Sequence, residues 1–597
     1  MSEESKQTGI DSQLLRRIIS YLAPYKWLVA IAFVTVMTAA FLGPLIPKLV
    51  QVTIDRDIVG GDAEGLRRMI MILFAILAAE GLLSFVNAYL TQWIGQQAIF
   101  DLRQKVYRHV QRQSLQFFDT TPIGRLITRV TSDVESLSQV LSAGVVTIMG
   151  DLFKIIFISW FMFTLNWQLA LITLSVMPLM LYASFWFKKK VRFAYRDTRK
   201  QVARLNSFLQ EHVTGMRIVQ LFGREEEEMS RFEGINDDHR QAHIDTIFYF
   251  ALFFPAVDIV ATTALGLIIW YGGLSSMQGG LTLGVLIAFI QYARRFFEPI
   301  RNLSDQFNTL QSAMAGAERI FGLLDSDLSI PESDEPDRWE EVRGKIEFRN
   351  VWFSYDRDLN EEDEDSNWIL RDVSFVVEPG QSLAIVGATG AGKTTIISLL
   401  LRFYEIQKGQ IFVDGLEISN LRLNELRAHI GLVLQDVFLF SGSVRENVTL
   451  RNESLNDDDI RRAADAIGAS SFIDRLPSVY DQEVKERGMS LSHGQRQLLS
   501  FVRALVYDPR ILVLDEATSS VDTETEEIIQ HALETLMEGR TSIAIAHRLS
   551  TIQHADQILV MHRGQVRERG THQELIKTEG LYRTLYELQY REQEVAA

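Results

Sequence analysis

The sequence predicts an all-α membrane domain of six spanning helices followed by a soluble α/β domain. Apolar runs long enough to cross a bilayer, about 20 residues each, recur up to about residue 303 and then stop. Beyond residue 343, apolar strands alternate with helices, a pattern typical of α/β domains. The polar, acidic stretch DSDLSIPESDEPDRWEEVRG lies between the two parts. A chain of 597 residues is also long enough for at least two domains.

Composition excludes several classes of protein. The formal net charge is −16, and no basic stripe runs through the C-terminal half, so no nucleic acid partner is expected. The chain has no cysteine, which excludes disulfides, thiolate metal sites and cysteine nucleophiles. The first residues are polar, with neither a secretory signal nor an arginine- and serine-rich transit peptide. The amphipathic stretch LLRRIISYLAPY suits a helix lying on a membrane surface.

Charge asymmetry orients the predicted spans within a membrane domain of residues 1–325. The six spans are expected at about 27–47, 68–94, 138–164, 167–187, 246–272 and 281–303. The segments 98–130 and 188–240 are rich in arginine and lysine, whereas the alternate connections carry little positive charge. The positive-inside rule therefore places both termini and the two basic segments in the cytoplasm, with the chain in the cytoplasmic (inner) membrane. Residues 326–343 are predicted to be a linker and 344–597 the soluble domain.

Two elbows interrupt the long cytoplasmic helices that the basic segments predict. Pro122 and Gly124 break FFDTTPIGRLITRVTSDV, and Gly223 breaks VQLFGREEEEMSRF. A loop that is merely solvated has little need of exposed aromatic residues. The aromatic residues of the elbows therefore predict contact with a second domain: Phe117, Phe118 and Phe222.

Several charged residues fall near the middle of predicted spans, where charge is costly and tends to be paired or functional. Asp151 with Lys154, and Arg295 with Glu298, have the spacing of pairs on one helix face. Pairing inside the bundle and lining of a wet cargo path remain open alternatives. The candidates for a substrate cavity are Glu80, Asp151, Lys154, Asp258 and Arg294.

A phosphate-binding loop follows an apolar strand in QSLAIVGATGAGKTTIISLLLRF. The run GATGAGKT, Gly387 to Thr394, fits G-x-x-x-x-G-K-[ST] between a strand and a helix. Glycines let backbone N–H groups fold round phosphates, Lys393 neutralises phosphate charge, and the Thr394 hydroxyl can ligate Mg²⁺. The expected nucleotide-binding residues here are Gly387, Thr389, Gly390, Ala391, Gly392, Lys393, Thr394 and Thr395.

Two acidic residues end a second buried strand, in ILVLDEATSSVD. The strand delivers Asp515 and Glu516 to its carboxyl end, where parallel sheets bind ligands. Asp515 can hold a metal ion directly or through water, and Glu516 is suited to polarise a water aimed at the terminal phosphate. Together with the upstream loop, this pattern predicts an α/β P-loop NTPase domain that uses ATP and Mg²⁺.

The order of motifs resembles that of ATP-binding cassette (ABC) exporters, over nearly the whole chain. The motifs are Tyr355 in VWFSY, GATGAGKT, Gln435 in GLVLQDVFLFSGSVREN, LSHGQ, ILVLDE, SSVD around Asp522, and His547 in IAIAHRLS. The match is to bacterial-type multidrug or lipid half-transporters, with six spans and one nucleotide-binding domain. The resemblance implies that Tyr355 stacks on adenine, that Gln435 senses the metal and the attacking water, and that His547 contacts the terminal phosphate. It also implies that Ser492, His493, Gly494, Gln495 and Asp522 close over the ATP of a partner half-transporter.

His493 departs from the family's LSGGQ pattern, in which its position is glycine. A side chain there occupies space where backbone should approach phosphate, and the conformational freedom of glycine is lost. This chain resembles the catalytically competent half of heterodimeric exporters, because its own catalytic set is complete: Lys393, Thr394, Gln435, Asp515, Glu516 and His547. A homodimer that tolerates the variant is the alternative.

The expected activity is ATP-driven export of a small hydrophobic or amphipathic cargo across the lipid bilayer by alternating access. A homodimeric lipid flippase and an ATP-gated channel are the alternatives, although a channel would be expected to carry a large regulatory insert. A soluble DNA-repair ATPase is inconsistent with the predicted spans. The acid-rich insertion after Tyr355, residues 356–366, is expected to be solvated, a regulatory or metal contact being the alternative. The identity and charge of the cargo stay open.

Overall fold

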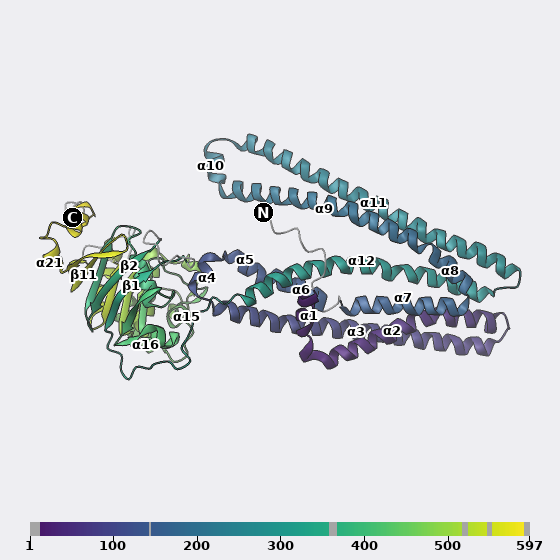
Figure 1. Cartoon of the computed structure of the whole chain (residues 1–597), viewed down its shortest axis with the longest axis horizontal. Helices are drawn as coiled ribbons and strands as arrows, with labels where there is room; N and C mark the ends of the chain where they lie inside the picture. Colours follow the sequence, from purple (N-terminus) through teal and green to yellow (C-terminus); the bar gives the residue numbers. More distant parts are fainter. Residues whose placement is uncertain (1–11, 142–144, 357–366, 516–522, 546–551, 590–597) are drawn as a thin grey trace. The chain divides into compact units, whose positions relative to one another are not determined.

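The computed structural model describes residues 12–141, 145–356, 367–515, 523–545 and 552–589. The chain divides into two compact units. The first comprises Met1–Gln111 and Ile123–Ser326, and the second comprises Arg112–Pro122 and Asp327–Ala597. Figure 1 shows that the first unit is built from helices and that the second contains the sheets.

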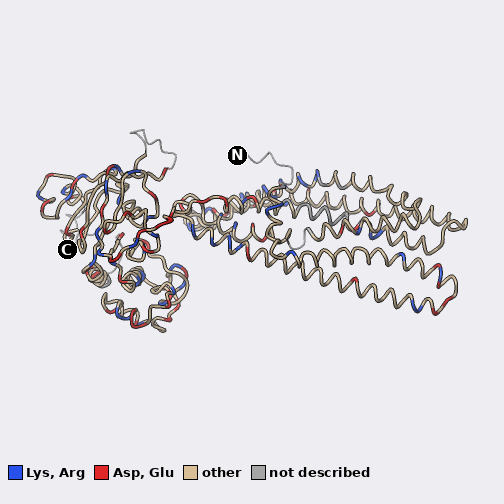
Figure 2. The backbone as a smooth tube through the Cα atoms, turned by 60° about the horizontal axis from the view of Figure 1, so that its bottom comes forward, with Lys and Arg blue, Asp and Glu red and all other residues tan. Residues whose placement is uncertain are grey.

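Long helices make up most of the first unit. They are α2 (Lys26–Val52), α3 (Ala63–Gln111), α7 (Val145–Leu165), α9 (Met177–Thr214), α11 (Glu225–Met277) and α12 (Leu283–Asp325). The shorter helices are α1 (Ser12–Ser20), α5 (Ile123–Thr128), α6 (Val134–Gln139), α8 (Trp167–Ser175) and α10 (Met216–Leu221). Figure 2 shows long stretches of these helices without charged residues, as a membrane domain requires.

The spans differ from the prediction in two places. Among the described residues, five helices are long and apolar enough to cross a membrane, rather than the predicted six. The helix α12 covers the predicted sixth span but is not one of the five; its apolar half also carries Arg294, Arg295 and Glu298. The predicted fourth span is divided at Val176, where α8 ends and α9 begins with a proline in its first turn. Proline lacks the N–H that would continue the helix.

Prolines in α2 explain how α12 packs against it. Because Pro47 has no N–H, the carbonyl of Gly43 has no partner one turn along the helix. The Arg295 guanidinium donates to that carbonyl at 2.6 Å, and the Tyr292 hydroxyl donates to the Pro44 carbonyl at 2.7 Å. The predicted Arg295–Glu298 pair is therefore wrong: Glu298 is exposed, and Arg295 binds the backbone of another helix instead. Phe289, Tyr292 and Phe296 of α12 are buried in the core that this packing forms.

The amphipathic helix α1 is bonded to the end of α12. Arg17 of α1 donates twice to the Asp325 carboxylate, both at 2.7 Å, and its guanidinium lies 4.3 Å from the centre of the Phe321 ring. The ring of Tyr21 stacks on the same phenylalanine. These contacts tie the N-terminal helix to the last turn before the second unit begins.

Two principal sheets form the second unit. The antiparallel sheet has the order β2-β1-β4-β5, and the larger sheet has the order β12-β11-β3-β10-β9-β6. The strands of the first are β1 (Ile346–Phe353), β2 (Leu370–Val377), β4 (Lys408–Val413) and β5 (Leu416–Glu417). The strands of the second are β3 (Ser382–Gly387), β6 (Ile430–Val433), β9 (Ile511–Asp515), β10 (Thr541–Ile545), β11 (Gln557–His562) and β12 (Gln565–Gly570). A third pair joins β7 (Gly442–Ser443) to β8 (Glu483–Val484).

The larger sheet is parallel from β11 to β6, and only β12 runs antiparallel. Its central strands are apolar and buried, as parallel strands covered on both faces should be. The helices beside the sheets are α13 (Lys393–Leu400), α14 (Leu423–Ala428), α15 (Val444–Thr449), α16 (Asp457–Ala466), α17 (Ser470–Ile473), α18 (His493–Val506), α19 (Thr523–Met537), α21 (His572–Leu575) and α22 (Leu581–Gln589). This arrangement brings the carboxyl ends of β3, β6, β9 and β10 to one edge.

The stretch predicted to be a linker is bonded to the second unit at several points. The buried Arg402 donates to the carbonyl of Pro331 at 2.5 Å, and the Trp339 indole donates to the carbonyl of Val413 at 3.2 Å. The segment Arg112–Pro122, which follows α3 and contains helix α4 (Leu115–Thr120), also belongs to this unit. The Ser114 N–H donates to the Leu328 carbonyl at 3.1 Å, which joins the two segments.

Candidate functional site: a nucleotide pocket at the sheet edge

The loop between β3 and α13 has the backbone that phosphate binding requires. Gly390 and Gly392 adopt φ of +80° and +99°, a left-handed region that favours glycine. A Cβ at Gly392 would also lie 2.7 Å from the Leu370 side chain, so the close approach needs glycine for space as well. The first N–H groups of α13 are left without helix partners by geometry, and with the helix dipole they favour an anion.

Lys393 stands at the first position of α13, inside this loop. Its ammonium donates to the carbonyls of Gly387 at 2.8 Å and Ala388 at 3.1 Å. Burial lowers the pKa of Lys393, and the negative charge of Asp515 opposes that shift. A buried ammonium held among loop carbonyls is well placed to neutralise phosphate oxygens.

Oxygen-bearing side chains lie at the same edge of the sheet. Asp515 ends β9 and pairs in register with Ile545 of β10, while Leu514 pairs with Val433 of β6. Gln435 follows β6 by two residues and is exposed, and Thr394 is exposed at the start of α13. A hydroxyl, a carboxylate and an amide oxygen are ligands that Mg²⁺ accepts, so this donor set fits that ion. The predicted residues Glu516, Asp522 and His547 lie outside the described residues.

Tyr355 provides an aromatic face beside the phosphate loop. The residue is 43% exposed, and its hydroxyl lies 3.1 Å from the Thr395 hydroxyl of α13. The ring packs edge-on against Phe353 and Tyr404, with centroid distances of 4.8 and 5.0 Å. The rest of its surface is available for stacking on a base, as the sequence predicts.

The packing also identifies three residues that the sequence analysis missed. The Tyr404 hydroxyl is hydrogen-bonded to the Asp119 carboxylate of α4. Burial raises the pKa of Tyr404, and the bond to Asp119 adds to that effect. Gln116 of α4 donates to the Tyr355 carbonyl at 3.5 Å. The first elbow thus contacts the nucleotide domain through Gln116 and Asp119, as predicted. Phe117 is buried rather than exposed.

The LSHGQ motif forms the start of α18. Ser492 is the N-cap, and its hydroxyl accepts from the Gln495 N–H at 3.2 Å while the Gln495 side chain accepts from the Ser492 N–H at 2.9 Å. His493 is the first helical residue, half-buried, and its φ is not in the left-handed region. The conformational part of the argument from the sequence is therefore wrong, since any residue can adopt this helical position. His493 differs from glycine here by the volume of its imidazole, whose Nδ1 lies 3.5 Å from the Arg496 guanidinium.

A buried polar pair fixes the loop that follows Gln435. The Asn447 side chain donates to the carbonyls of Phe440 at 2.9 Å and Ser443 at 3.1 Å, and it accepts from the Phe440 N–H at 2.8 Å. Arg503 of α18 donates to the Asn447 carbonyl at 2.8 Å, and burial lowers the pKa of this guanidinium. These bonds join the loop to α18, the helix that begins with the LSHGQ motif.

The candidate cavity residues of the first unit fall into different environments. Asp151 is buried and lies 3.9 Å from Lys154, so the predicted pair is present at the limit of an ion-pair distance. Glu80 and Arg295 both lie close to Gly43, since a Cβ at Gly43 would lie 2.7 Å from the Glu80 carboxylate and 3.5 Å from the Arg295 guanidinium. Asp258 and Arg294 are exposed in the single chain. Of the five, all within the described residues, only Asp151 and Lys154 are bonded to one another, and a cavity lined by all five stays a prediction.

Comparison with known proteins gives the family. Residues 29–300 match the family "ABC transporter transmembrane region", and residues 370–519 match the family "ABC transporter". The chain is 38% identical over 96% of its length to an uncharacterized ABC transporter ATP-binding protein, YknV, of Bacillus subtilis, covering 94% of that protein. It is 37% identical over 97% of its length to an ATP-dependent lipid A-core flippase of Desulfotalea psychrophila, covering all of it. A probable multidrug resistance ABC transporter protein of Bacillus subtilis, YheH, is 36% identical over 88% of this chain and 77% of its own. With a membrane region and a nucleotide pocket in one polypeptide, this chain belongs to the ABC transporters, as a half-transporter whose ATPase drives transport.

Proposed function

We propose that this chain exports a hydrophobic or amphipathic molecule by alternating access, as one half of a dimer in the cytoplasmic membrane. One observation carries the proposal. The segment Arg112–Pro122, which lies between membrane-domain helices in the sequence, packs onto the nucleotide domain beside Tyr355. A displacement of the nucleotide domain therefore acts directly on the helices that flank this segment.

The described residues support distinct roles in ATP binding. Tyr355 stacks on adenine, the Gly387–Thr395 loop and Lys393 hold the phosphates, and Gln435 orients the attacking water. Thr394, Gln435 and Asp515 would hold Mg²⁺, which would supply positive charge to offset that of the phosphates. Glu516 is proposed as the general base, and His547 as a contact to the terminal phosphate.

The second nucleotide domain is proposed to come from another half-transporter. Ser492, His493, Gly494, Gln495 and Asp522 would then close over the partner's ATP. The imidazole of His493 takes up volume where the partner's phosphate would approach the N-terminus of α18. This favours a heterodimer in which the ATP site completed by this chain's LSHGQ motif hydrolyses ATP more slowly than the other site. The elbow at α10 supports dimer formation, because Leu221 and Phe222 are 76% and 71% exposed in the single chain.

A lipid flippase is the second candidate function. It is favoured by the relatives named ATP-dependent lipid A-core flippase, which match nearly the whole chain. Drug-like and lipid cargoes are both amphipathic, so the same apolar cavity could serve either.

Transport into sealed inside-out membrane vesicles that hold this chain together with its partner half-transporter tests these functions together. With ATP outside, accumulation of an amphipathic dye above its equilibrium level is expected, and Lys393→Ala should abolish it. Movement of a fluorescent phospholipid between leaflets, with no dye accumulation, would favour the flippase. Equilibration of solutes without accumulation would contradict transport and indicate a channel.

A further inference from the structure

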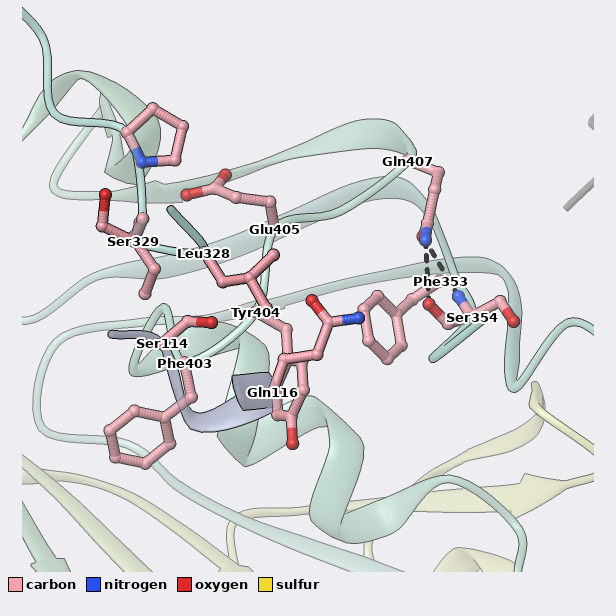
Figure 3. A pocket seen from close by; sticks show the side chains of 12 residues that line it. Ser114, Gln116, Leu328, Ser329, Phe353, Ser354, Phe403, Tyr404, Glu405 and Gln407 are labelled. Carbon is pink, nitrogen blue, oxygen red and sulfur yellow. Dashed lines mark hydrogen bonds between the residues drawn. The ribbon is translucent and has the colours of Figure 1, made fainter. Parts of the chain in front are cut away.

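A small cavity lies within the second unit where three chain segments meet. It has a volume of about 120 Å³ and is partly open. Its walls come from the start of α4, from the segment after α12, and from the region around β1 and the end of α13, as Figure 3 shows. The residues that matter for the argument are Ser114, Leu328, Pro331, Phe353, Tyr404 and Glu405.

Most polar groups around the cavity already have partners. Gln407 and Ser354 bond one another through their backbone and side-chain groups at 2.8 and 3.0 Å (Figure 3). Glu405 accepts from the Arg402 guanidinium at 2.7 Å, so its charge is compensated. The Tyr404 hydroxyl is bonded to Asp119. The remaining wall is aromatic and aliphatic, which favours a neutral and largely apolar occupant.

Ser114 is the exception. It is 8% exposed, and its hydroxyl has no hydrogen-bond partner among the described residues. It occupies the N-cap position of α4, yet its side chain makes no capping bond there. Figure 3 shows the Ser114 side chain directed toward the space beside Leu328 and Tyr404. A buried hydroxyl is costly when it has no partner, so a ligand that bonds it gains affinity.

We propose that this cavity binds a small neutral amphiphile, made of one ring with a single hydroxyl group. A dry cavity of about 150 Å³ accepts benzene, so a cavity of this size suits a ring of about six carbon atoms. The aromatic and aliphatic walls contact the ring, and Ser114 bonds its hydroxyl. Since the cavity is partly open, the ring can also be the end of a larger neutral molecule.

A molecule bound in this cavity would affect the nucleotide pocket through one side chain, that of Tyr404. Tyr404 lines the cavity, and its ring packs 5.0 Å from that of Tyr355, the proposed adenine platform. An occupant that holds Tyr404 in place would alter ATP affinity. This consequence rests on the proposed role of Tyr355, whereas the binding itself does not.

Binding of 4-fluorophenol to the full chain in lipid nanodiscs, followed by fluorine NMR line broadening without nucleotide, tests the proposal. Fluorobenzene, which lacks the hydroxyl, is the matched probe, and empty nanodiscs give the lipid background. Ser114→Ala removes the hydroxyl, and Leu328→Trp fills the cavity. Ser542→Ala is the control, because Ser542 is also buried with an unpartnered hydroxyl but lies in β10, outside the cavity.

The fluorine resonance of 4-fluorophenol should broaden saturably with the unmodified chain and with Ser542→Ala, which reports binding of 4-fluorophenol. Its affinity should fall by about threefold or more in Ser114→Ala and be lost in Leu328→Trp, while fluorobenzene should bind equally to the unmodified chain and Ser114→Ala. Broadening no greater than that of empty nanodiscs would overturn the proposal, as would equal affinity in all the variants. Because no nucleotide is present, failure here is distinguishable from failure of ATP-driven transport.

Discussion

At the scale of single residues, Tyr355 shows how much of the site depends on one aromatic face. Its hydroxyl contacts Thr395 at 3.1 Å, but the proposed work of stacking is done by the ring. The motif order marked this residue in the sequence. Its supports Tyr404 and Asp119 could not be found in that way, because 285 residues separate them and only the fold brings them together.

Tyr355→Ala should raise the Kd for ATP by about 5- to 100-fold, since stacking of a base on an aromatic ring is worth about 1–3 kcal/mol. Tyr355→Phe keeps the ring and loses only the Thr395 contact, so its Kd should stay within about threefold of the unmodified value. Titration with a fluorescent ATP analogue measures both. Equal loss of affinity in the two variants would show that the hydroxyl, not the ring, is the important group.

Asn447→Ala should loosen the loop after Gln435. The substitution leaves the Phe440 N–H and two carbonyls without their buried partner, at a cost of about 2–4 kcal/mol in local opening free energy. Hydrogen exchange of the Phe440 amide should accelerate accordingly. The exposed Asn452 is the control, and unchanged exchange in Asn447→Ala would contradict the role assigned to this side chain.

At the scale of elements, two short helices tie distant parts of the chain together. The sequence predicts helix α4 only as an elbow with exposed aromatic residues, and the structure shows that one of them, Phe117, is buried. The sequence reveals that an elbow exists because proline and glycine break helices locally. It cannot reveal which surface the elbow meets, since that depends on contacts between residues far apart in the chain.

Tyr404→Phe and Asp119→Asn should uncouple cargo from ATP hydrolysis. Both weaken the bond between α4 and the nucleotide domain but leave the Tyr355 platform, so ATP affinity should change by less than about threefold. In the assembled dimer, stimulation of the ATPase by cargo should fall severalfold. Tyr507→Phe, which loses a 2.5 Å bond to the Thr449 carbonyl away from α4, is the matched control. Retained stimulation in both variants would contradict this role of α4.

Helix α1 should respond to acid through Asp325. The hydrogen bond from Arg17 lowers the pKa of Asp325 below 3.8, so the pair stabilises the α1–α12 contact above about pH 4. That contribution is lost as pH falls through the lowered pKa. Both side chains are partly exposed, so the effect is small and screened by salt.

Hydrogen exchange of α1 should therefore be constant from pH 7 to about pH 5, after correction for the intrinsic rate, and rise only in more acid solution. Arg17→Gln should show the raised exchange at pH 7. The neighbouring Arg16, which is exposed, supplies the control Arg16→Gln. Identical exchange in the two variants would mean that the ion pair does not hold α1.

At the scale of the whole molecule, the two-part architecture follows from properties that act over long stretches. Hydrophobic runs and the order of nucleotide motifs predict it, because bilayer thickness and phosphate geometry restrict the sequence strongly. The same patterns predict the number of apolar spans less well. Charged residues such as Arg294 make α12 less apolar than the other spanning helices. The volume that His493 occupies at the start of α18 is the feature that favours a heterodimer over a homodimer.

Hydrolysis of ATP by the purified chain alone, in lipid nanodiscs, tests the central claim most directly. The account predicts that the folded chain binds ATP but hydrolyses it at a rate close to that of Glu516→Gln, and that His493→Gly raises the rate about tenfold or more. Rapid hydrolysis by the unmodified chain, abolished by Glu516→Gln and unaffected by His493→Gly, would contradict it. The chain would then be a self-sufficient homodimer.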